Sequence, residues 1–360
     1  MTELGFLKKE NLVEFLKELT TKFAVYVPVE DDDVVTFKPF QENKTICLDR
    51  PANIPPKTVI FPQYETLLTF TFSKKEDKPD KIDVKIQEKM DFKDTIIFAA
   101  KPCDAKGFTV YDRVYKDSDI PDPYYTGRRE KTVIIALSCS NVSPGCFCTA
   151  VGSAPSDKEG SDVLMTEVSG GFVLEPVTEK GKAVIQSKFI EDGAKYLEEA
   201  KKKQEDIKNK VKNPFKKAGK PQISQEKFND DNFWESALSK CLSCGACTFL
   251  CPTCYCFNIT DENKIWEAER LRSWDACMFP HFTLEASGHN PRPTKFHRFK
   301  NRVGHKFLYY PEKYNGVLAC CGCGRCIRYC PVSVDISKVV DDLSDTTNEN
   351  KTLTSNGGEA

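Results

Sequence analysis

The chain has 360 residues, 40% of them apolar, which is enough to bury the cores of two or three domains. Its 52 Lys and Arg nearly balance 53 Asp and Glu, so no overall charge favours a nucleic acid or a membrane surface as a partner. The unusual feature is the 17 cysteines, which favour disulfides in a secreted protein and metal binding in a cytosolic one.

The N-terminus and the apolar runs indicate a cytoplasmic protein. The first residues carry acids and lack the uninterrupted apolar stretch of a signal peptide. The longest apolar runs, such as Ile96–Ala100 and Val133–Leu137, are far too short to span a bilayer. We therefore expect a soluble protein with reduced thiols, metal-binding cysteines and no membrane contact.

Residues 1–198 are predicted to form a mixed α/β domain. The domain is expected to begin with an amphipathic helix that carries Leu12, Leu16, Leu19 and Phe23 on one face. Segments rich in Val, Ile, Phe and Thr, separated by Pro and Gly, predict its strands. These segments are Ala24–Val29, Val34–Phe40, Thr58–Phe61, Leu67–Phe72, Ile96–Ala100, Thr132–Leu137 and Phe172–Val177.

A Lys-rich segment and a polar tail flank the second predicted domain. Residues 199–227 are predicted to form a solvated helix and a linker broken at Pro214 and Pro221, with a docking patch for an acidic partner as the alternative. Residues 228–343 contain most of the cysteines and form the second domain. The polar tail, residues 344–360, is expected to be disordered.

Two cysteine motifs in the second domain are the most specific feature of the sequence. The first is Cys241-Leu-Ser-Cys244-Gly-Ala-Cys247-Thr-Phe-Leu-Cys251-Pro252. The second is Cys320-Cys-Gly-Cys323-Gly-Arg-Cys326-Ile-Arg-Tyr-Cys330-Pro331. Both follow the spacing C-x2-C-x2-C-x3-C-P, which binds 4Fe-4S clusters in bacterial ferredoxins.

The spacing predicts which thiol binds which cluster. Three cysteines, each three residues apart, wrap three corners of a cubane, and Gly245 and Gly324 let the backbone approach the inorganic sulfides. In ferredoxins with two such motifs, the fourth cysteine of each motif ligates the other cluster. We therefore assign to the first cluster Cys241, Cys244, Cys247 and Cys330. The second cluster is assigned Cys251, Cys320, Cys323 and Cys326.

Two other metal chemistries fit parts of this pattern. Zinc also binds C-x2-C pairs, but a zinc site gives no reason for two identical C-x3-C-P endings. Cys247, Cys251 and Cys254 match the C-x3-C-x2-C spacing of radical-SAM enzymes, although two of them already belong to the longer motif.

The long gap between the motifs predicts the fold of the second domain. The 69 positions from Cys251 to Cys320 are too many for a compact ferredoxin and resemble the all-helical ferredoxin fold. Helices are expected over residues 261–274 and after Pro331. The predicted fold class is therefore α+β, a mixed α/β domain followed by an all-helical ferredoxin-like domain.

Four cysteines of the first domain are predicted to form a third site. Cys103 and Cys139 each follow a predicted strand, and Cys146 and Cys148 lie in the loop just beyond. Because ligand sites gather at strand ends in α/β domains, these thiols could meet at one 4Fe-4S cluster. The alternatives are unrelated buried thiols, a zinc site or a loop that contacts a flavin.

The remaining cysteines and a basic stretch are expected to surround the clusters. Cys254, Cys256, Cys277 and Cys321 are predicted to be buried neighbours of the cluster sulfurs, with a further ligand role as the alternative, and Cys47 is predicted to be structural. Residues 286–310 contain six Lys or Arg and no acid. Such a stretch favours compensation of cluster charge over a nucleic-acid surface, because no RNA-binding motif accompanies it.

Several short signatures in order resemble a known family. They are Cys103-Asp104, Tyr124-Tyr125 with Arg128-Arg129-Glu130, Cys139 with Cys146-Phe-Cys148, Cys251-Pro-Thr-Cys254-Tyr-Cys256, Arg272-Ser-Trp274 with Cys277, Gly288-His-Asn290 with Arg292-Pro-Thr294, and Gly322-Cys323-Gly-Arg-Cys326. Over residues 5–340 the chain is similar to the 4Fe-4S electron-transfer subunit of anaerobic sulfite reductase and to the β subunit of sulfhydrogenase. The Lys-rich segment is not one of these signatures.

The resemblance implies a protein that carries electrons while other subunits perform the chemistry. The implied partners are a flavin subunit that uses NAD(P)H and a sirohaem or nickel–iron catalytic subunit. The sequence contains no G-x-G-x-x-G and no Walker loop, so no nicotinamide or ATP site is expected in the chain itself. No catalytic residue is expected, and a redox sensor or an assembly protein with the same clusters is the alternative.

Overall fold

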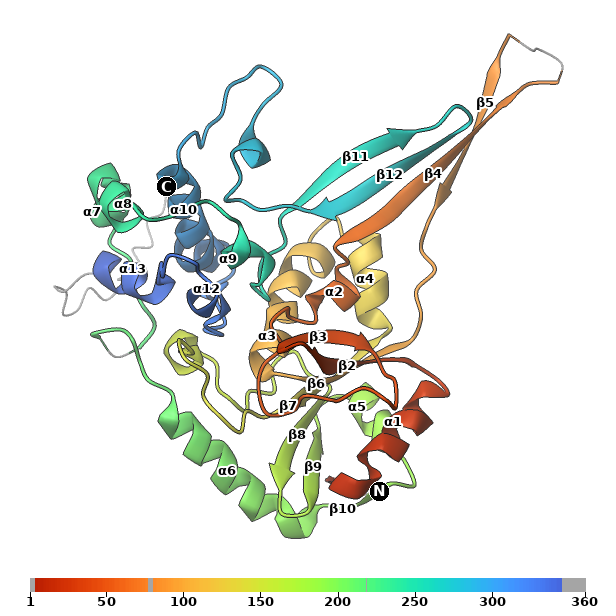
Figure 1. Ribbon diagram of the computed structural model, residues 1–360, viewed down its shortest axis with the longest axis vertical. Helices are drawn as coiled ribbons and strands as arrows, with labels where there is room; N and C mark the ends of the chain where they lie inside the picture. Colours follow the sequence, from red (N-terminus) through yellow and green to blue (C-terminus); the bar gives the residue numbers. More distant parts are fainter. Residues whose placement is uncertain (1–3, 77–79, 218, 345–360) are drawn as a thin grey trace, which may run out of the picture.

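A mixed eight-stranded sheet organises the N-terminal part of this computed structural model, which describes residues 4–76, 80–217 and 219–344 (Figure 1). The strand order is β10-β1-β9-β8-β7-β6-β2-β3. β2, β6, β7 and β8 are parallel neighbours, and the other pairings are antiparallel. The strands are β1 (Gly5–Lys8), β2 (Ala24–Asp31), β3 (Val34–Pro39), β6 (Thr95–Ala100), β7 (Thr132–Leu137), β8 (Val163–Val168), β9 (Gly171–Pro176) and β10 (Ile190–Asp192).

Helices cover both faces of this sheet, so β6 and β7 are buried over their whole length. Side chains alternate along a strand, and Ile96 therefore packs on one face while Ile97 packs on the other. The first face carries α1 (Leu12–Thr20) and α5 (Glu179–Val184). The second carries α3 (Pro102–Tyr111) and α4 (Pro123–Glu130).

The mixed α/β prediction for the N-terminal part is confirmed, with one wrong element. The amphipathic helix is α1, which buries Leu12, Leu16 and Leu19 and ends before Phe23. The strand predicted over Thr58–Phe61 is instead the short helix α2 (Lys57–Ile60). A single turn after Pro56 buries Lys57 and Ile60 together, and its β-branched composition misled the prediction.

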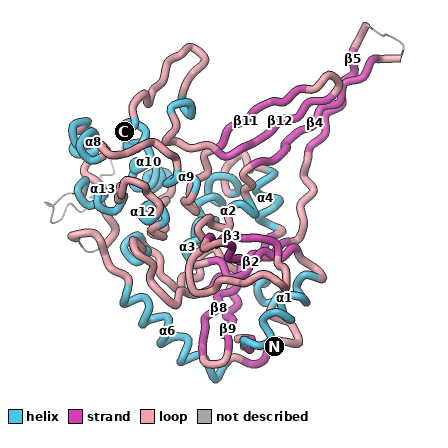
Figure 2. The backbone as a smooth tube through the Cα atoms, viewed as in Figure 1, coloured by secondary structure: helices cyan, strands magenta, loops and turns pink. Residues whose placement is uncertain are grey.

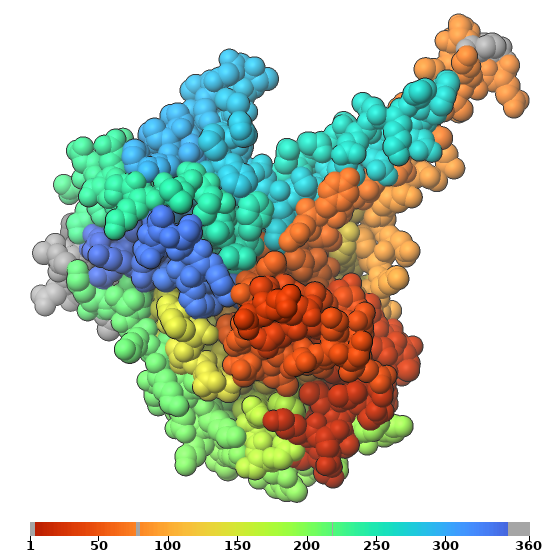
Figure 3. Space-filling model, viewed as in Figure 1, coloured from red at the N-terminus to blue at the C-terminus, as the bar shows by residue number. Residues whose placement is uncertain are grey.

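A second, four-stranded antiparallel sheet extends away from the body of the molecule (Figures 1 and 3). Its order is β11-β12-β4-β5. The hairpin β4–β5 comes from the N-terminal part and the hairpin β11–β12 from the segment between the cysteine motifs. The strands are β4 (Tyr64–Lys74), β5 (Ile82–Glu88), β11 (Phe257–Asn263) and β12 (Glu267–Trp274).

This second sheet corrects two predictions. The helix expected over residues 261–274 is wrong, because these residues form parts of β11 and β12. The C-terminal part is therefore not all-helical. Its Glu- and Arg-rich strand β12 pairs with β4, far away in the sequence, and this tertiary pairing overrides local helix propensity.

The rest of the C-terminal part consists of short helices and loops (Figure 2). The helix predicted after Pro331 is confirmed as α13. The helices from the Lys-rich segment onward are α6 (Leu197–Lys210), α7 (Gln225–Asn229), α8 (Asp231–Ala237), α9 (Ala246–Phe249), α10 (Lys295–Gly304), α11 (Tyr310–Lys313), α12 (Arg325–Arg328) and α13 (Ile336–Leu343). Within the described ranges, no helix has the length and apolarity to cross a bilayer. The predicted disordered tail lies outside the described residues, apart from Ser344.

A buried ion-pair network holds the second sheet against the body. Arg272 on β12 contacts Glu65 on the neighbouring strand β4 at 2.6 Å and also pairs with Asp122, the N-cap residue of α4. Arg128 on α4 reaches the same Glu65 at 2.5 Å. The Arg272-Ser-Trp274 signature therefore has a structural reason, which is the anchoring of β12.

We predict that Arg272→Met lowers the free energy of unfolding by about 3–5 kcal/mol, because it leaves the Glu65 carboxylate buried with one cation fewer. Arg270→Met is the matched control: two residues earlier on β12, Arg270 forms an exposed pair with Asp261 at 2.8 Å. That change should cost about 0–1 kcal/mol. Anaerobic guanidinium unfolding followed by far-UV circular dichroism measures both, and equal effects would contradict the role of Arg272.

Candidate metal centre

The two cysteine motifs adopt the same backbone turn. In each, the third and fifth residues have positive φ: Ser243 and Gly245 in the first motif (54° and 76°), Gly322 and Gly324 in the second (63° and 70°). A short helix follows the left-handed glycine, α9 in the first motif and α12 in the second, and the two helices contact each other. A glycine at the fifth position lets the loop turn sharply between the second and third cysteines.

Each turn lines a cavity that contains the four thiols predicted for one cluster. The first cavity is lined by Cys241, Cys244, Cys247 and Cys330. The second cavity is lined by Cys251, Cys320, Cys323 and Cys326. The fourth cysteine of each motif therefore lies in the cavity of the other motif, which is the arrangement that crossed ligation needs.

The two cavities share part of their walls. Cys326 and Arg302 line both of them. Apolar side chains complete the first cavity, among them Met278, Phe299 and Val334. Among the described residues, no three Cys, His or carboxylate side chains converge to hold a single ion. The thiols instead surround two adjacent spaces, and a cubane with four irons takes its ligands around a volume in this way.

Two buried cations face the cavities and contact neutral groups and thiols. Arg302 on α10 donates to Cys254 Sγ at 3.1 Å and to the Cys247 carbonyl at 2.5 Å, and its buried Nε has no partner in the described part of the chain. Lys306 donates to Thr253 Oγ1 at 2.7 Å. A buried guanidinium with an unused donor is costly on its own, so it fits an anionic cluster held in these cavities.

Electrostatics around the cavities favour charged cations. Burial lowers the pKa of Lys306, but the nearby thiols of Cys251 and Cys254 outweigh it, so the pKa is raised. Neighbouring thiols likewise outweigh burial and raise the pKa of Arg302. His305, by contrast, has its pKa lowered to about 4 by burial and by Lys306, so it is neutral at pH 7 and bonds to the Tyr255 hydroxyl.

Cys254, Cys256 and Cys277 lie together beside the first motif, and the first and last of them are buried. Cys254 lies next to Cys251, and a hydrogen bond from Cys256 lowers the pKa of Cys277 to about 6. The N-terminal part supports this group, because Lys57 donates to the Cys254 carbonyl at 2.9 Å. Burial lowers the pKa of Lys57 to about 8. That these thiols surround the clusters without binding iron stays a prediction.

The second motif is fixed to the N-terminal part by a fully buried ion pair. Arg325, between two predicted ligands, contacts Asp104 with both terminal nitrogens at 2.6 and 3.0 Å. Its Nε donates to the Ala52 carbonyl at 2.9 Å. Asp104 lies in the first turn of α3, directly after Cys103. The N-terminal part therefore holds the turn between Cys323 and Cys326, which both line the second cavity.

The sequence did not identify all of these residues. The basic stretch 286–310 indicated cations near the clusters, but spacing could not show that Arg302 and Lys306 point inward while Lys300 pairs with Asp231. Nothing near Lys57 indicated a role, since it comes from α2. The Asp104–Arg325 pair joins two of the family signatures, and only tertiary structure brings them together.

Comparison with known proteins identifies the domain that contains both motifs. The model of the 4Fe-4S dicluster domain matches residues 240–334, which span both motifs. Sulfhydrogenase 2 subunit beta of Pyrococcus furiosus is 31% identical over 343 residues, which cover 94% of this chain and 97% of that protein. The chain belongs to the sulfhydrogenase β-subunit family. No solved structure matches it. The sulfhydrogenase β resemblance seen in the sequence is thus confirmed, and the dicluster domain implies two 4Fe-4S clusters and electron transfer.

We predict that Cys251→Ser alters the cluster of the second motif, because Cys251 lies in that cavity. Its electron paramagnetic resonance (EPR) spectrum after dithionite reduction should match that of Cys323→Ser and differ from that of Cys244→Ser. Cys330→Ser is the reciprocal control and should match Cys244→Ser. If Cys251→Ser instead matched Cys244→Ser, each motif would hold its own cluster.

A second prediction concerns Arg302. Arg302→Met should lower the reduction potentials of both clusters by on the order of 100 mV, since a unit charge a few ångströms away contributes roughly 2–4 kcal/mol at an effective dielectric constant of about 20. Lys300→Met, on the same helix and paired with Asp231, is the matched control and should leave both potentials nearly unchanged. An EPR-monitored redox titration measures both variants, and a shift in only one cluster would show that Arg302 does not serve both.

Proposed function

We propose that this sulfhydrogenase β-family chain is a cytosolic electron-relay subunit. In this proposal, one 4Fe-4S cluster is bound by Cys241, Cys244, Cys247 and Cys330. The other is bound by Cys251, Cys320, Cys323 and Cys326. When bound, the clusters supply one-electron transfer, and the protein supplies ligands, position and potential. The observation that carries the proposal is the pair of adjacent cavities with crossed motifs and a shared wall.

The exposure of the first motif supports exchange of electrons with a partner. Cys244 is exposed, and its neighbour Leu242 is 64% exposed although it is apolar. The second cavity is more enclosed, because Cys251, Cys321 and Cys323 on its wall are buried. A cluster near the surface can exchange electrons with another protein, and a buried one can pass them inward. We therefore assign the first motif to an interface with another subunit.

Membership of the family supports a proposal about the partners of this chain. The P. furiosus relative is named as a subunit of a sulfhydrogenase, so that protein works in a complex. We propose that the present chain relays electrons between a flavin subunit that uses NAD(P)H and a catalytic subunit with a nickel–iron or sirohaem centre. Electrons could flow in either direction, since the cluster chemistry is reversible.

We predict that the isolated chain accepts electrons from dithionite but turns over neither NADH nor sulfite, because the proposed roles are confined to ligation and relay. Anaerobic spectrophotometric assays of the single chain test this. Adding the flavin and catalytic subunits should restore turnover, and Cys244→Ser should reduce it. Rapid sulfite reduction or NADH oxidation by the single chain would overturn the relay assignment.

The alternative proposal is a redox sensor or assembly protein with the same clusters. The exposed Cys244 is the feature that favours it, because an exposed ligand gives oxidants access to the first cluster. The two functions differ on brief oxidation with ferricyanide followed by dithionite. A relay keeps all its iron and recovers its EPR signals, whereas a sensor or assembly protein loses iron or transfers it.

A further inference from the structure

We propose that Cys103, Cys139, Cys146 and Cys148 bind a third 4Fe-4S cluster, placed directly beside the second motif. The proposal goes beyond the two-cluster relay and does not depend on which partners that relay serves. It rests on three observations: the thiols follow adjacent strand ends, their loop is docked on the second motif, and that loop is anchored to α3.

The first observation is the position of the thiols in the sheet. β6 and β7 are parallel neighbours, so their carboxyl ends lie at the same edge of the sheet. Cys103 follows β6 in the first turn of α3, and Cys139 lies two residues after the end of β7. Cys148 begins the short 3₁₀ helix that ends the next loop. This edge is where α/β sheets place their ligand sites.

The second observation is the contact between the thiol loop and the second motif. The Phe147 N–H donates to the Gly322 carbonyl at 2.8 Å, and Cys146 Sγ contacts the Cys323 carbonyl at 3.4 Å. A Cβ at Gly322 would lie 2.6 Å from the Cys148 backbone, so only glycine allows this approach. Cys146 and Cys148 are therefore adjacent to the second motif.

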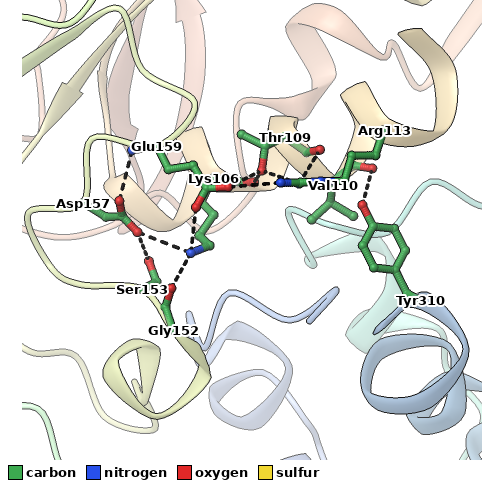
Figure 4. A network of polar contacts seen from close by, with 9 residues as sticks. All are labelled: Lys106, Thr109, Val110, Arg113, Gly152, Ser153, Asp157, Glu159 and Tyr310. Atoms are coloured by element: carbon green, nitrogen blue, oxygen red, sulfur yellow. Dashed lines mark hydrogen bonds and ion pairs between the residues drawn. The ribbon is translucent and has the colours of Figure 1, made fainter. Parts of the chain in front are cut away.

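The third observation is a polar network that anchors the end of the loop to α3 (Figure 4). Lys106 on α3 donates to the Gly152 carbonyl at 2.5 Å and pairs with Asp157 at 3.4 Å and Glu159 at 3.0 Å. Ser153 Oγ donates to the same Asp157 at 2.8 Å. Cys103 and Cys148 thus lie on two elements that are joined to each other, which preorganises the thiols.

Cations surround this group as they surround the two C-terminal cavities. Arg328 Nη1 donates to the Pro144 carbonyl at 2.8 Å and contacts Cys146 Sγ at 3.7 Å. Lys101, two residues before Cys103, is buried and donates to the Leu48 carbonyl at 2.8 Å. Positive charge on two sides fits an anionic cluster better than a set of neutral thiols.

Iron and sulfide analysis of the full-length protein, purified anaerobically with iron and sulfide supplied, tests the proposal. The wild type should contain about twelve irons, four for each cubane. Cys139→Ser and Cys148→Ser should each contain about eight and keep the EPR signals of both C-terminal clusters. The matched control is Cys47→Ser, which changes a buried thiol that contacts Asp49 and should keep about twelve.

Three further variants separate this site from the other thiols nearby. Cys321 lies between two ligands of the second motif and near Cys103, and Cys277 belongs to the group beside the first motif. Cys321→Ser and Cys277→Ser should both keep the third cluster, whereas Cys103→Ser should lose it. Loss of the third cluster in Cys277→Ser with retention in Cys139→Ser would overturn the assignment.

The wild-type result alone can also overturn the proposal, even if a variant fails to fold. About eight irons with both C-terminal signals present would exclude the third cluster and leave the relay intact. About eight irons with one zinc would assign the N-terminal thiols to zinc and exclude the cluster as well. A protein without iron would overturn both the third cluster and the proposed function.

Discussion

The burial of positive charge beside cysteine thiols is the constraint on which this structure depends. Arg302 and Lys306 are almost completely buried, and their polar contacts are made with carbonyls, a hydroxyl and a thiol. Two buried cations so placed would destabilise the fold unless an anion lay between the surrounding thiols. An anionic cluster held by the cysteine motifs offsets the cost of burying these cations, and the cations in turn stabilise the cluster. The helix α10 and the cysteine motifs therefore depend on each other.

The N-terminal part has a direct role in the C-terminal site. Its α2 and α3 supply Lys57 and Asp104, which contact the backbone after the first motif and Arg325 inside the second. The Tyr310 hydroxyl on α11 returns to the Val110 carbonyl at 3.1 Å, so α3 is held from both sides (Figure 4). The sheet thus works as a rigid support that fixes the position of the second motif and of the loop packed on it.

Helices and strands with a clear apolar pattern in their own sequence were predicted correctly. The amphipathic period of α1 and the apolar runs of β6 and β7 could be assigned, because burial against one core determines them. The spacing of the motifs predicted two sets of four ligands, and the members of each set line one cavity, while the ligation itself stays a prediction. The helix expected over residues 261–274 failed because the partner strand β4 lies in another part of the chain. The Asp104–Arg325 pair could not be predicted for the same reason.

We expect two 4Fe-4S clusters in adjacent cavities with a shared wall. EPR spectroscopy of the full-length Cys139→Ser variant, which keeps only the two C-terminal clusters, tests this arrangement most directly after complete reduction with dithionite. Two reduced cubanes so close together are magnetically coupled. We therefore expect a broadened spectrum that integrates to about two spins per chain. Two sharp, independent signals would contradict the shared wall, and an EPR-silent protein with stoichiometric zinc would contradict the clusters themselves.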